Sequence, residues 1–259
     1  RRRYLNARNT ISMLIDNGVV PIINENDTVA TSEIRYGDND RLAARVTTMA
    51  SFDCLIILSD VNGIYTLPPD NSNAVHIPEI TNITKEIQSM AKTTKNDYGS
   101  GGMITKIEAA RIAMDGGANM IIASGKEQNP IKALMDGGKN SHFIAKITPH
   151  LARKKWISGM LTPNGKIYID DGAKAALFNG RSLLPAGIVN AEGKFERGDA
   201  VIIFDKDRNE IARGLSAYSI DDTLSIKGKN SDEIEQILGY RGRTALVHRD
   251  DLVISDTGN

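Results

Sequence analysis

The chain has 259 residues, of which 41% are hydrophobic and 25% charged, as is typical of a globular protein with room for two domains. Basic and acidic side chains number 32 each, so overall charge indicates no polyanionic partner. The one cysteine, Cys54, excludes an internal disulfide and suits a reducing compartment. The four histidines lack metal-ligand spacing, and no apolar run reaches the roughly 18 residues of a membrane span.

The first part of the chain alternates between helix and strand patterns. An opening helix ends near Gly18, and the apolar segment after it predicts a short strand over residues 19–24. The next expected elements, in order, are a helix over 39–51, a strand over 54–60, a helix from 103, a strand over 119–124 and a short helix over 129–138. This alternation predicts an α/β fold with a mainly parallel sheet covered on both faces.

The second part has a different pattern of predicted elements, which is typical of a small, mostly β module. Residues 165–180 predict a strand and a short helix, and Ser231 is the expected N-cap of a further helix. Short strands are expected over 199–205, 210–219, 222–228, 244–248 and 251–255. We expect domain boundaries at 1–148 and 164–259, with a linker over 149–163 whose basic stretch, 153–155, is solvated.

Polar residues follow the strands and begin a helix in the first part. Asp27 follows the apolar segment 19–24, Ser59 and Asp60 end the strand 54–60, and Asn39 and Asp40 begin the next helix. Each alone is more typical of a cap or turn. Because ligands gather beyond the carboxyl ends of parallel strands, the residues together favour a binding site at that edge.

The stretch DYGSGGMITK, residues 97–106, is a glycine-rich loop that leads into a helix. Free N–H groups at a helix N-terminus suit an anion, and Lys106 adds a positive charge in the first turn. That position is unfavourable for the helix dipole, so a negative group is expected nearby. The stretch matches neither the Walker A nor the dinucleotide fingerprint, and alone it fits a phosphate site and an ordinary loop equally well.

Several motifs, in this order, resemble the glutamate 5-kinases of the amino acid kinase superfamily: PIINENDTV, YGDNDRLAARV, LSDVNGIYT and GSGGMITKIEAA. The second part, with IDDGAKAALFNGRSLLPAGIV and LGYRGRTALVHRDDLVI, resembles the PUA domain that many bacterial members carry. The resemblance implies a three-layer α/β sandwich followed by a PUA-like barrel. It also implies ATP-dependent phosphorylation of the side-chain carboxylate of L-glutamate to L-glutamate 5-phosphate, the first step of proline biosynthesis, in the cytoplasm.

The resemblance also implies roles for individual residues. Asp27 and Asn39 would contact glutamate, Asp40 would hold the active-site lysines in place, and Lys106 would act on the transferring phosphoryl group. The implied ATP site comprises Ser59, Asp60, Ser100, Gly101, Gly102, Met103, Ile104, Thr105 and Lys106. Mg²⁺ would bind mostly to ATP oxygens and water, with no dedicated protein ligands. Proline is a candidate feedback inhibitor, and a homo-oligomer is expected.

The chain departs from the family pattern at its start. Family members begin with a strand, a glycine-rich loop bearing a second phosphate-contacting lysine, and a serine-containing glutamate loop, none of which is matched here. The expectation is therefore a chain that lacks about the first hundred residues of its kinase domain, exposes apolar helix faces and is inactive or nearly so alone.

Two alternatives remain at this stage. A kinase of another small acid or of a nucleotide monophosphate would share the fold. An RNA-binding protein acting through the PUA-like module is disfavoured, because residues 160–259 carry 13 basic and 16 acidic side chains, whereas a phosphate backbone calls for a basic face.

Overall fold

The structure, a computed structural model, describes residues 2–24, 39–91, 102–159 and 162–255, with side chains from residue 6 onward. It divides into two compact units. The α/β unit comprises Thr10–Ala152, and the β unit comprises Arg1–Asn9 together with Arg153–Asn259. The chain therefore passes from one unit to the other twice, once within α1 and once within α6. Within the described ranges, no helix is both long and apolar enough to cross a membrane.

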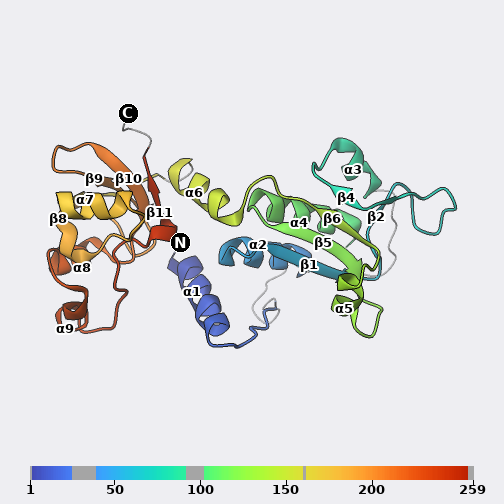
Figure 1. The fold of residues 1–259 in the computed structure, drawn as a ribbon, viewed down its shortest axis with the longest axis horizontal. Coiled ribbons are helices and arrows are strands. Elements are labelled where there is room, and N and C mark those ends of the chain that lie inside the picture. The colour runs from blue at the N-terminus through green and yellow to red at the C-terminus, as the bar shows by residue number, and fades with distance from the viewer. Residues whose placement is uncertain (1, 25–38, 92–101, 160–161, 256–259) are drawn as a thin grey trace, which may run out of the picture. The chain divides into compact units, whose positions relative to one another are not determined.

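The α/β unit is built on a four-stranded sheet of order β1-β5-β6-β4 (Figure 1). β1 and β5 are parallel, as are β4 and β6, whereas β5 and β6 are antiparallel. The elements from the start of the chain to the second crossing are α1 (Arg2–Asp16), α2 (Asn39–Ala50), β1 (Cys54–Ser59), β2 (Ile64–Tyr65), β3 (His76–Ile77), β4 (Glu79–Ile80), α3 (Lys85–Met90), α4 (Met103–Asp115), β5 (Asn119–Ser124), α5 (Pro130–Met135), β6 (Asn140–Phe143) and α6 (Pro149–Gly159). The predicted α/β class is confirmed.

Helices α2 and α4 lie side by side against the sheet, and their small side chains allow this close approach (Figure 1). Ala44, Ala109 and Ala110 are fully buried in one cluster with Leu55 and Ile57 of β1. Only residues 51–53 separate α2 from β1, and residues 116–118 separate α4 from β5, so each helix runs opposite to the strand after it. The N-termini of both helices therefore lie at the carboxyl edge of the strands.

The expected strand over residues 19–24 is wrong, because those residues form no strand. No edge of the described sheet pairs with the N–H and C=O groups of this segment. Val20 and Ile22 are 84% and 96% exposed. The expectation that both sheet faces are covered fails at β1: Leu55 and Ile57 are buried, but the alternate residues Ile56 and Leu58 are exposed.

The β unit contains a five-stranded sheet of order β11-β10-β9-β7-β8, in which only β7 and β9 pair in parallel. Ile167, Ile169 and Ile203 are fully buried in its core, together with Leu246 and Val247. Its elements after α6 are β7 (Gly165–Ile169), α7 (Asp171–Phe178), the 3₁₀ turn η1 (Pro185–Gly187), β8 (Ile188–Gly193), β9 (Ala200–Phe204), β10 (Glu210–Leu215), α8 (Ile220–Ile226), η2 (Ser231–Glu233), α9 (Ile234–Leu238), η3 (Arg249–Asp251) and β11 (Leu252–Ile254). The predicted, mostly β module is confirmed.

Three local predictions in this unit are wrong. Residues 222–228 belong largely to helix α8 rather than to a strand, because Ser219 caps that helix by accepting a hydrogen bond from the Asp222 N–H. Residues 244–248 contribute only an isolated bridge between Val247 and Leu183. The cap of the next helical segment is Asn230, not Ser231, and Asn230 forms a reciprocal capping box with Glu233.

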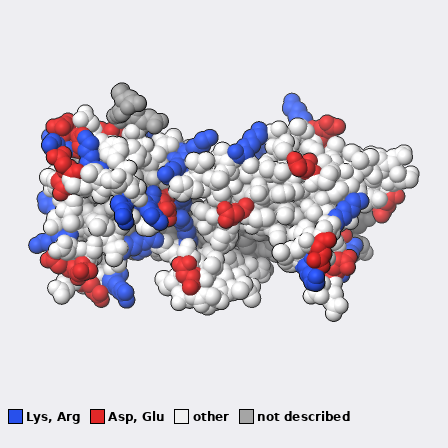
Figure 2. Space-filling view, viewed as in Figure 1, with Lys and Arg blue, Asp and Glu red and all other residues white. Residues whose placement is uncertain are grey.

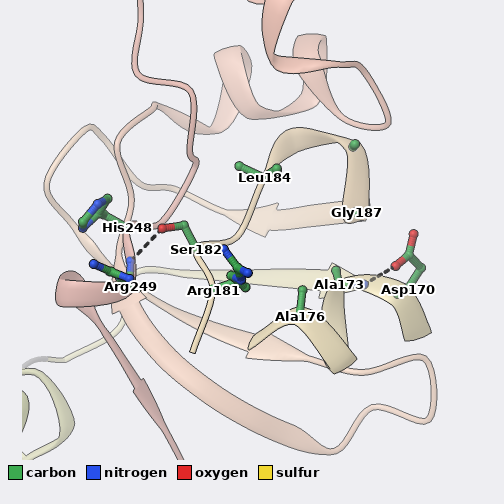
Figure 3. A pocket seen from close by; sticks show the side chains of 11 residues that line it. Asp170, Ala173, Ala176, Arg181, Ser182, Leu184, Gly187, His248 and Arg249 are labelled. Atoms are coloured by element: carbon green, nitrogen blue, oxygen red, sulfur yellow. Dashed lines mark hydrogen bonds between the residues drawn. The ribbon is translucent and has the colours of Figure 1, made fainter. Parts of the chain in front are cut away.

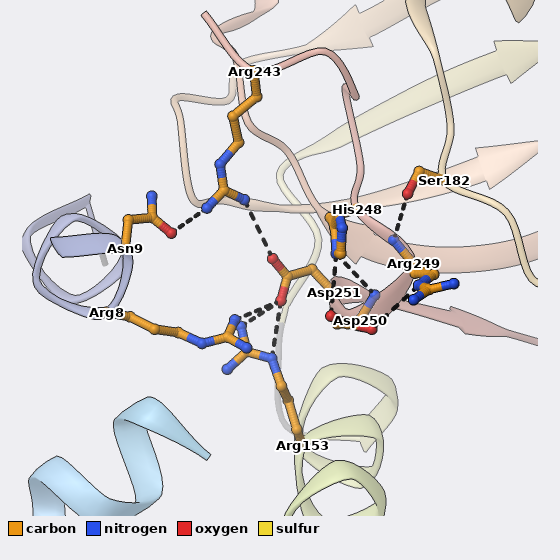
Figure 4. Close-up of polar contacts among 9 residues, drawn as sticks. All are labelled: Arg8, Asn9, Arg153, Ser182, Arg243, His248, Arg249, Asp250 and Asp251. Carbon is orange, nitrogen blue, oxygen red and sulfur yellow. Dashed lines mark hydrogen bonds and ion pairs between the residues drawn. The ribbon is translucent and has the colours of Figure 1, made fainter. Parts of the chain in front are cut away.

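The segment expected as a linker is the helix α6, and Arg153 within it is buried rather than solvated. The Arg153 guanidinium donates to the Asp251 carboxylate, with Nε 2.9 Å from Oδ1, and Arg8 of α1 donates to the same oxygen at 3.0 Å (Figure 4). Arg243 approaches the other oxygen at 3.8 Å and also donates to Asn9. One buried carboxylate thus holds three guanidiniums, and we call this group the Asp251 cluster.

We predict that Asp251→Asn destabilises the β unit by about 3–5 kcal/mol, because it leaves the buried Arg153 without a counter-charge. Burial raises the pKa of the Asp251 carboxyl, but the Arg153 and Arg8 guanidiniums outweigh that effect and hold the pKa below its usual range. A lowered folded-state pKa supplies stability above the unfolded-state value of about 3.9, and this stability is lost as pH falls through the folded-state pKa. The difference between wild type and variant should therefore be constant from pH 7 to 5 and shrink below about pH 4.

Urea unfolding followed by fluorescence of Trp156 measures this effect, because the only tryptophan packs against a small core cluster of the β unit. Asp171→Asn is the matched control: its ion pair with Lys206 is exposed, so a loss of at most about 1 kcal/mol is expected. Equal losses in the two variants would show that the Asp251 cluster contributes no more than a surface pair.

Candidate functional site

Two residues predicted from the sequence, Asp40 and Lys106, meet at the carboxyl edge of the sheet. Asp40 lies in the first turn of α2, and Lys106 is the fourth residue of α4. Lys106 Nζ lies 3.0 Å from Asp40 Oδ2, with side-chain exposures of only 10% and 17%. The pair supplies the negative group that the position of Lys106 near a helix N-terminus calls for.

Thr105 completes this junction between the helices. Its hydroxyl lies 3.1 Å from Asp40 Oδ2 and 2.7 Å from the Gly102 carbonyl oxygen, and its single proton serves one of these acceptors at a time. Farther along the same interface, Arg41 donates to Glu108 with Nε 2.6 Å from Oε2. Two ion pairs, from adjacent residues of α2 to residues two apart in α4, therefore fix how the two helices lie against each other.

The N-terminus of α4 has the properties of an anion site. Gly102 is its N-cap residue, and no side chain of the described residues caps the helix. The Thr105 N–H donates to the Gly102 carbonyl oxygen at 3.1 Å, which leaves the N–H groups of Met103 and Ile104 without a partner among the described residues. The Gly102 backbone is extended rather than left-handed, and a Cβ atom there would meet nothing within 4 Å. Neither backbone strain nor packing within the described residues therefore requires this glycine.

The other predicted residues are only partly assembled with this pair. Ser59 ends β1 and Asp60 follows it, and the Ser59 hydroxyl donates to Asp60 at 2.9 Å. Ser59 pairs in register with Ser124 at the end of β5, so they lie at the carboxyl edge, but no hydrogen bond between described residues joins them to Lys106. Asn39, Met103 and Ile104 occupy the first turns of α2 and α4. The residues predicted at 27, 100 and 101 lie outside the described ranges.

The sequence missed two side chains at this junction, Arg41 and Glu108. Each follows a predicted site residue by one or two positions, but they are 67 residues apart, and a single sequence contains no signal that pairs them. In the described ranges, no group of three or more histidine, cysteine or acidic side chains could hold a metal ion.

Comparison with known proteins identifies the family of this chain. The model of the amino acid kinase family matches residues 1–124, and that of the PUA domain matches residues 165–238. The glutamate 5-kinase of Bradyrhizobium sp. strain BTAi1 is 54% identical over 259 residues, which are 100% of this chain and 68% of that protein. The chain belongs to the glutamate 5-kinase family.

A second relative agrees with this membership. The glutamate 5-kinase of Rhodopseudomonas palustris strain BisB5 is 56% identical over 255 residues, 98% of this chain and 68% of that protein. Among solved structures, the carbamate kinase from Giardia lamblia is 24% identical, and the match covers 54% of this chain and 49% of that one with a TM-score of 0.37. The family is one of phosphotransferases that use ATP, with glutamate as the acceptor that its name specifies.

We predict that Asp40 and Lys106 are energetically coupled. Asp40→Asn and Lys106→Met should each destabilise the α/β unit, and the double variant should lose less than the sum of the two, by about 1–3 kcal/mol, because the second change removes a charge that already lacks its partner. Unfolding in urea followed by far-ultraviolet circular dichroism measures all three losses. Additivity to within about 0.5 kcal/mol would contradict the coupling.

Proposed function

We propose that the protein transfers the γ-phosphoryl group of ATP to the side-chain carboxylate of L-glutamate and that the Asp40–Lys106 pair lies at the centre of this reaction. A glutamate carboxylate oxygen forms the new bond to phosphorus, the bond from phosphorus to the β–γ bridging oxygen breaks, and the products are L-glutamate 5-phosphate and ADP. The observation that carries the proposal is the buried ion pair beside the start of α4, which no side chain of the described residues caps.

The chemistry requires little more than positioning and charge. A carboxylate is already ionised and nucleophilic at pH 7, so no general base is needed. The transferring phosphoryl group spreads negative charge over its oxygens, and donors fixed in advance stabilise that charge. Lys106 and the N–H groups at the start of α4 are such donors, and Asp40 holds the lysine in place and balances its charge.

Mg²⁺ would be held mainly by the nucleotide, because this ion ordinarily keeps several waters and binds phosphate oxygens. Asp60, exposed at the end of β1, is the residue we would place nearest to it. When bound, the ion neutralises phosphate charge, and the residues of this chain orient the reacting groups.

Further features of the proposal rest on the family resemblance. Asp27 and Asn39 would contact glutamate, and Ser59, Asp60 and the loop from Ser100 to Lys106 would surround ATP. We also propose a cytoplasmic, homo-oligomeric enzyme of proline biosynthesis with proline as a feedback inhibitor. The matched ranges 1–124 and 165–238 support a division into a kinase portion, 1–148, and a PUA-like domain, 164–259.

Charge weighs against RNA as the main partner. On the face of the β unit seen in Figure 2, basic and acidic side chains are interspersed rather than separated. A phosphate backbone instead favours a continuous basic stripe.

The test is ATP-dependent formation of γ-glutamyl hydroxamate, in which hydroxylamine traps the acyl phosphate. The chain is assayed alone and joined to the family's N-terminal segment, with aspartate and N-acetylglutamate as control acceptors. For the joined protein, we predict product from glutamate but not from the control acceptors. Lys106→Met should lower kcat roughly 10²–10³-fold, because one charged donor to the transition state is lost.

The Glu108→Gln variant is the matched control, because it removes a charge from the same helix interface without touching Lys106. It should lower kcat much less than Lys106→Met does. If the joined protein folds and binds ATP but forms no hydroxamate, glutamate is not the acceptor. If Lys106→Met retains full kcat, the role proposed for this lysine is wrong.

A further inference from the structure

The β unit contains a pocket of about 650 Å³ that the phosphoryl-transfer reaction does not use. Its walls come from α7, the segment that leads into η1, and the residues just before and within η3 (Figure 3). The surfaces of Ala173, Ala176 and Leu184 are apolar, whereas Arg181, Ser182, His248 and Arg249 introduce polar groups. A cavity of this size suits a small molecule with an apolar body and a polar end.

The walls are held by contacts that need no ligand. Asp170 caps α7 by accepting a hydrogen bond from the Ala173 N–H at 2.7 Å. The Ser182 hydroxyl oxygen accepts from the Arg249 N–H at 3.0 Å, which fixes the start of η3 against the opposite wall. A Cβ atom at Gly187 would lie 2.3 Å from that of Ala173, so only glycine allows η1 to approach α7 this closely. The pocket is therefore preformed.

The cations of the pocket are poorly neutralised. The Arg181 guanidinium is exposed and makes no hydrogen bond or ion pair with any residue that the structure describes. Arg249 is 65% exposed and approaches a carboxylate only at 3.8 Å, from Nε to Asp250 Oδ1. Arg181, His248 and Arg249 gather at one side of the hollow, whereas the carboxylate of Asp170 lies at the other end and is already committed to its cap (Figure 3). Two guanidiniums with unused donors suit an oxyanion.

We propose that this pocket binds a small organic oxyanion, a carboxylate or a phosphate monoester, with its anionic group at Arg181 and Arg249 and its apolar body against Ala173, Ala176 and Leu184. Guanidiniums bind both kinds of oxyanion in a bidentate manner, so the charged end alone does not choose between them. A long polyanion fits less well, because the Asp170 carboxylate at the other end of the pocket and Asp250 beside Arg249 would repel phosphates beyond the first.

The experiment is a titration of the ¹⁵N-labelled 259-residue chain with benzoate and phenyl phosphate, followed by amide chemical shifts. Acetate and inorganic phosphate test the need for an apolar body, and benzylamine reverses the charge. We expect chemical shift changes at the amides of Ser182, Gly187 and Arg249, with saturation near or below about 1 mM for benzoate, phenyl phosphate or both. Acetate and inorganic phosphate should bind more weakly, and benzylamine should not bind. The stronger of the two aromatic ligands identifies the preferred oxyanion.

Arg181→Ala should weaken binding about tenfold or more through loss of a charge-assisted hydrogen bond, and Arg181→Lys should recover part of it. Because Arg181 is exposed and lacks a partner among the described residues, folding should be unaffected. Lys194→Ala, at an exposed lysine outside the pocket lining, is the matched control and should bind as the wild type does. Equal affinity in wild type and Arg181→Ala would overturn the proposal. So would a single-stranded RNA that shifts these amides when neither aromatic anion does.

Discussion

The ion pair between Asp40 and Lys106 is the constraint on which the α/β unit depends. A lysine in the first turn of a helix faces the positive end of the helix dipole, and burying its ammonium removes most of its hydration. Both costs are met by one carboxylate from a neighbouring helix. The pair therefore forms only when α2 and α4 are aligned at their N-termini, and that alignment brings their first turns to the carboxyl edge of β1 and β5.

The β unit uses the same principle with the charges reversed. In the Asp251 cluster, a single carboxylate that is 5% exposed receives three guanidiniums, from α1, from α6 and from Arg243 (Figure 4). Both helices, α1 and α6, are segments in which the chain passes between the units. A buried pair of this kind contributes less net stability than its contacts suggest, but the loss of either partner is costly. Its main effect is to fix Arg8, Arg153 and η3 relative to one another within the β unit.

Local signals predicted most of the elements. Apolar periodicity predicted β1, β5 and α4. Two of its wrong predictions, the strands over 222–228 and 19–24, have different causes. The error at residues 222–228 was avoidable, since Ser219 and the two aspartates that follow it are a readable helix start. The error at residues 19–24 was not, because an apolar segment becomes a strand only where a neighbouring strand accepts its hydrogen bonds, and no local pattern reveals that neighbour.

The candidate site also combines features that a local pattern predicts with features that only the fold sets. The glycines and Lys106 could be recognised as a helix start suited to an anion, and the position of Lys106 called for a negative neighbour. The sequence did not show by itself that this neighbour is Asp40, 66 positions earlier, and the family resemblance was needed to suggest it. Arg153 was misjudged because the Asp251 carboxylate that neutralises it lies 98 residues away. Pairing across such distances is set by the fold, and no single-sequence pattern reports it.

The turn η3 places the proposed pocket next to the Asp251 cluster. Arg249 lines the pocket, and Asp251, two residues later in the same 3₁₀ turn, holds Arg8 and Arg153. A ligand in the pocket could shift a conformational equilibrium of η3, and thereby affect the cluster, only by the difference between its binding free energies for the two states. Asp250 lies between them and contacts both His248 and Arg249, so an anion that draws Arg249 into the pocket competes with an existing contact.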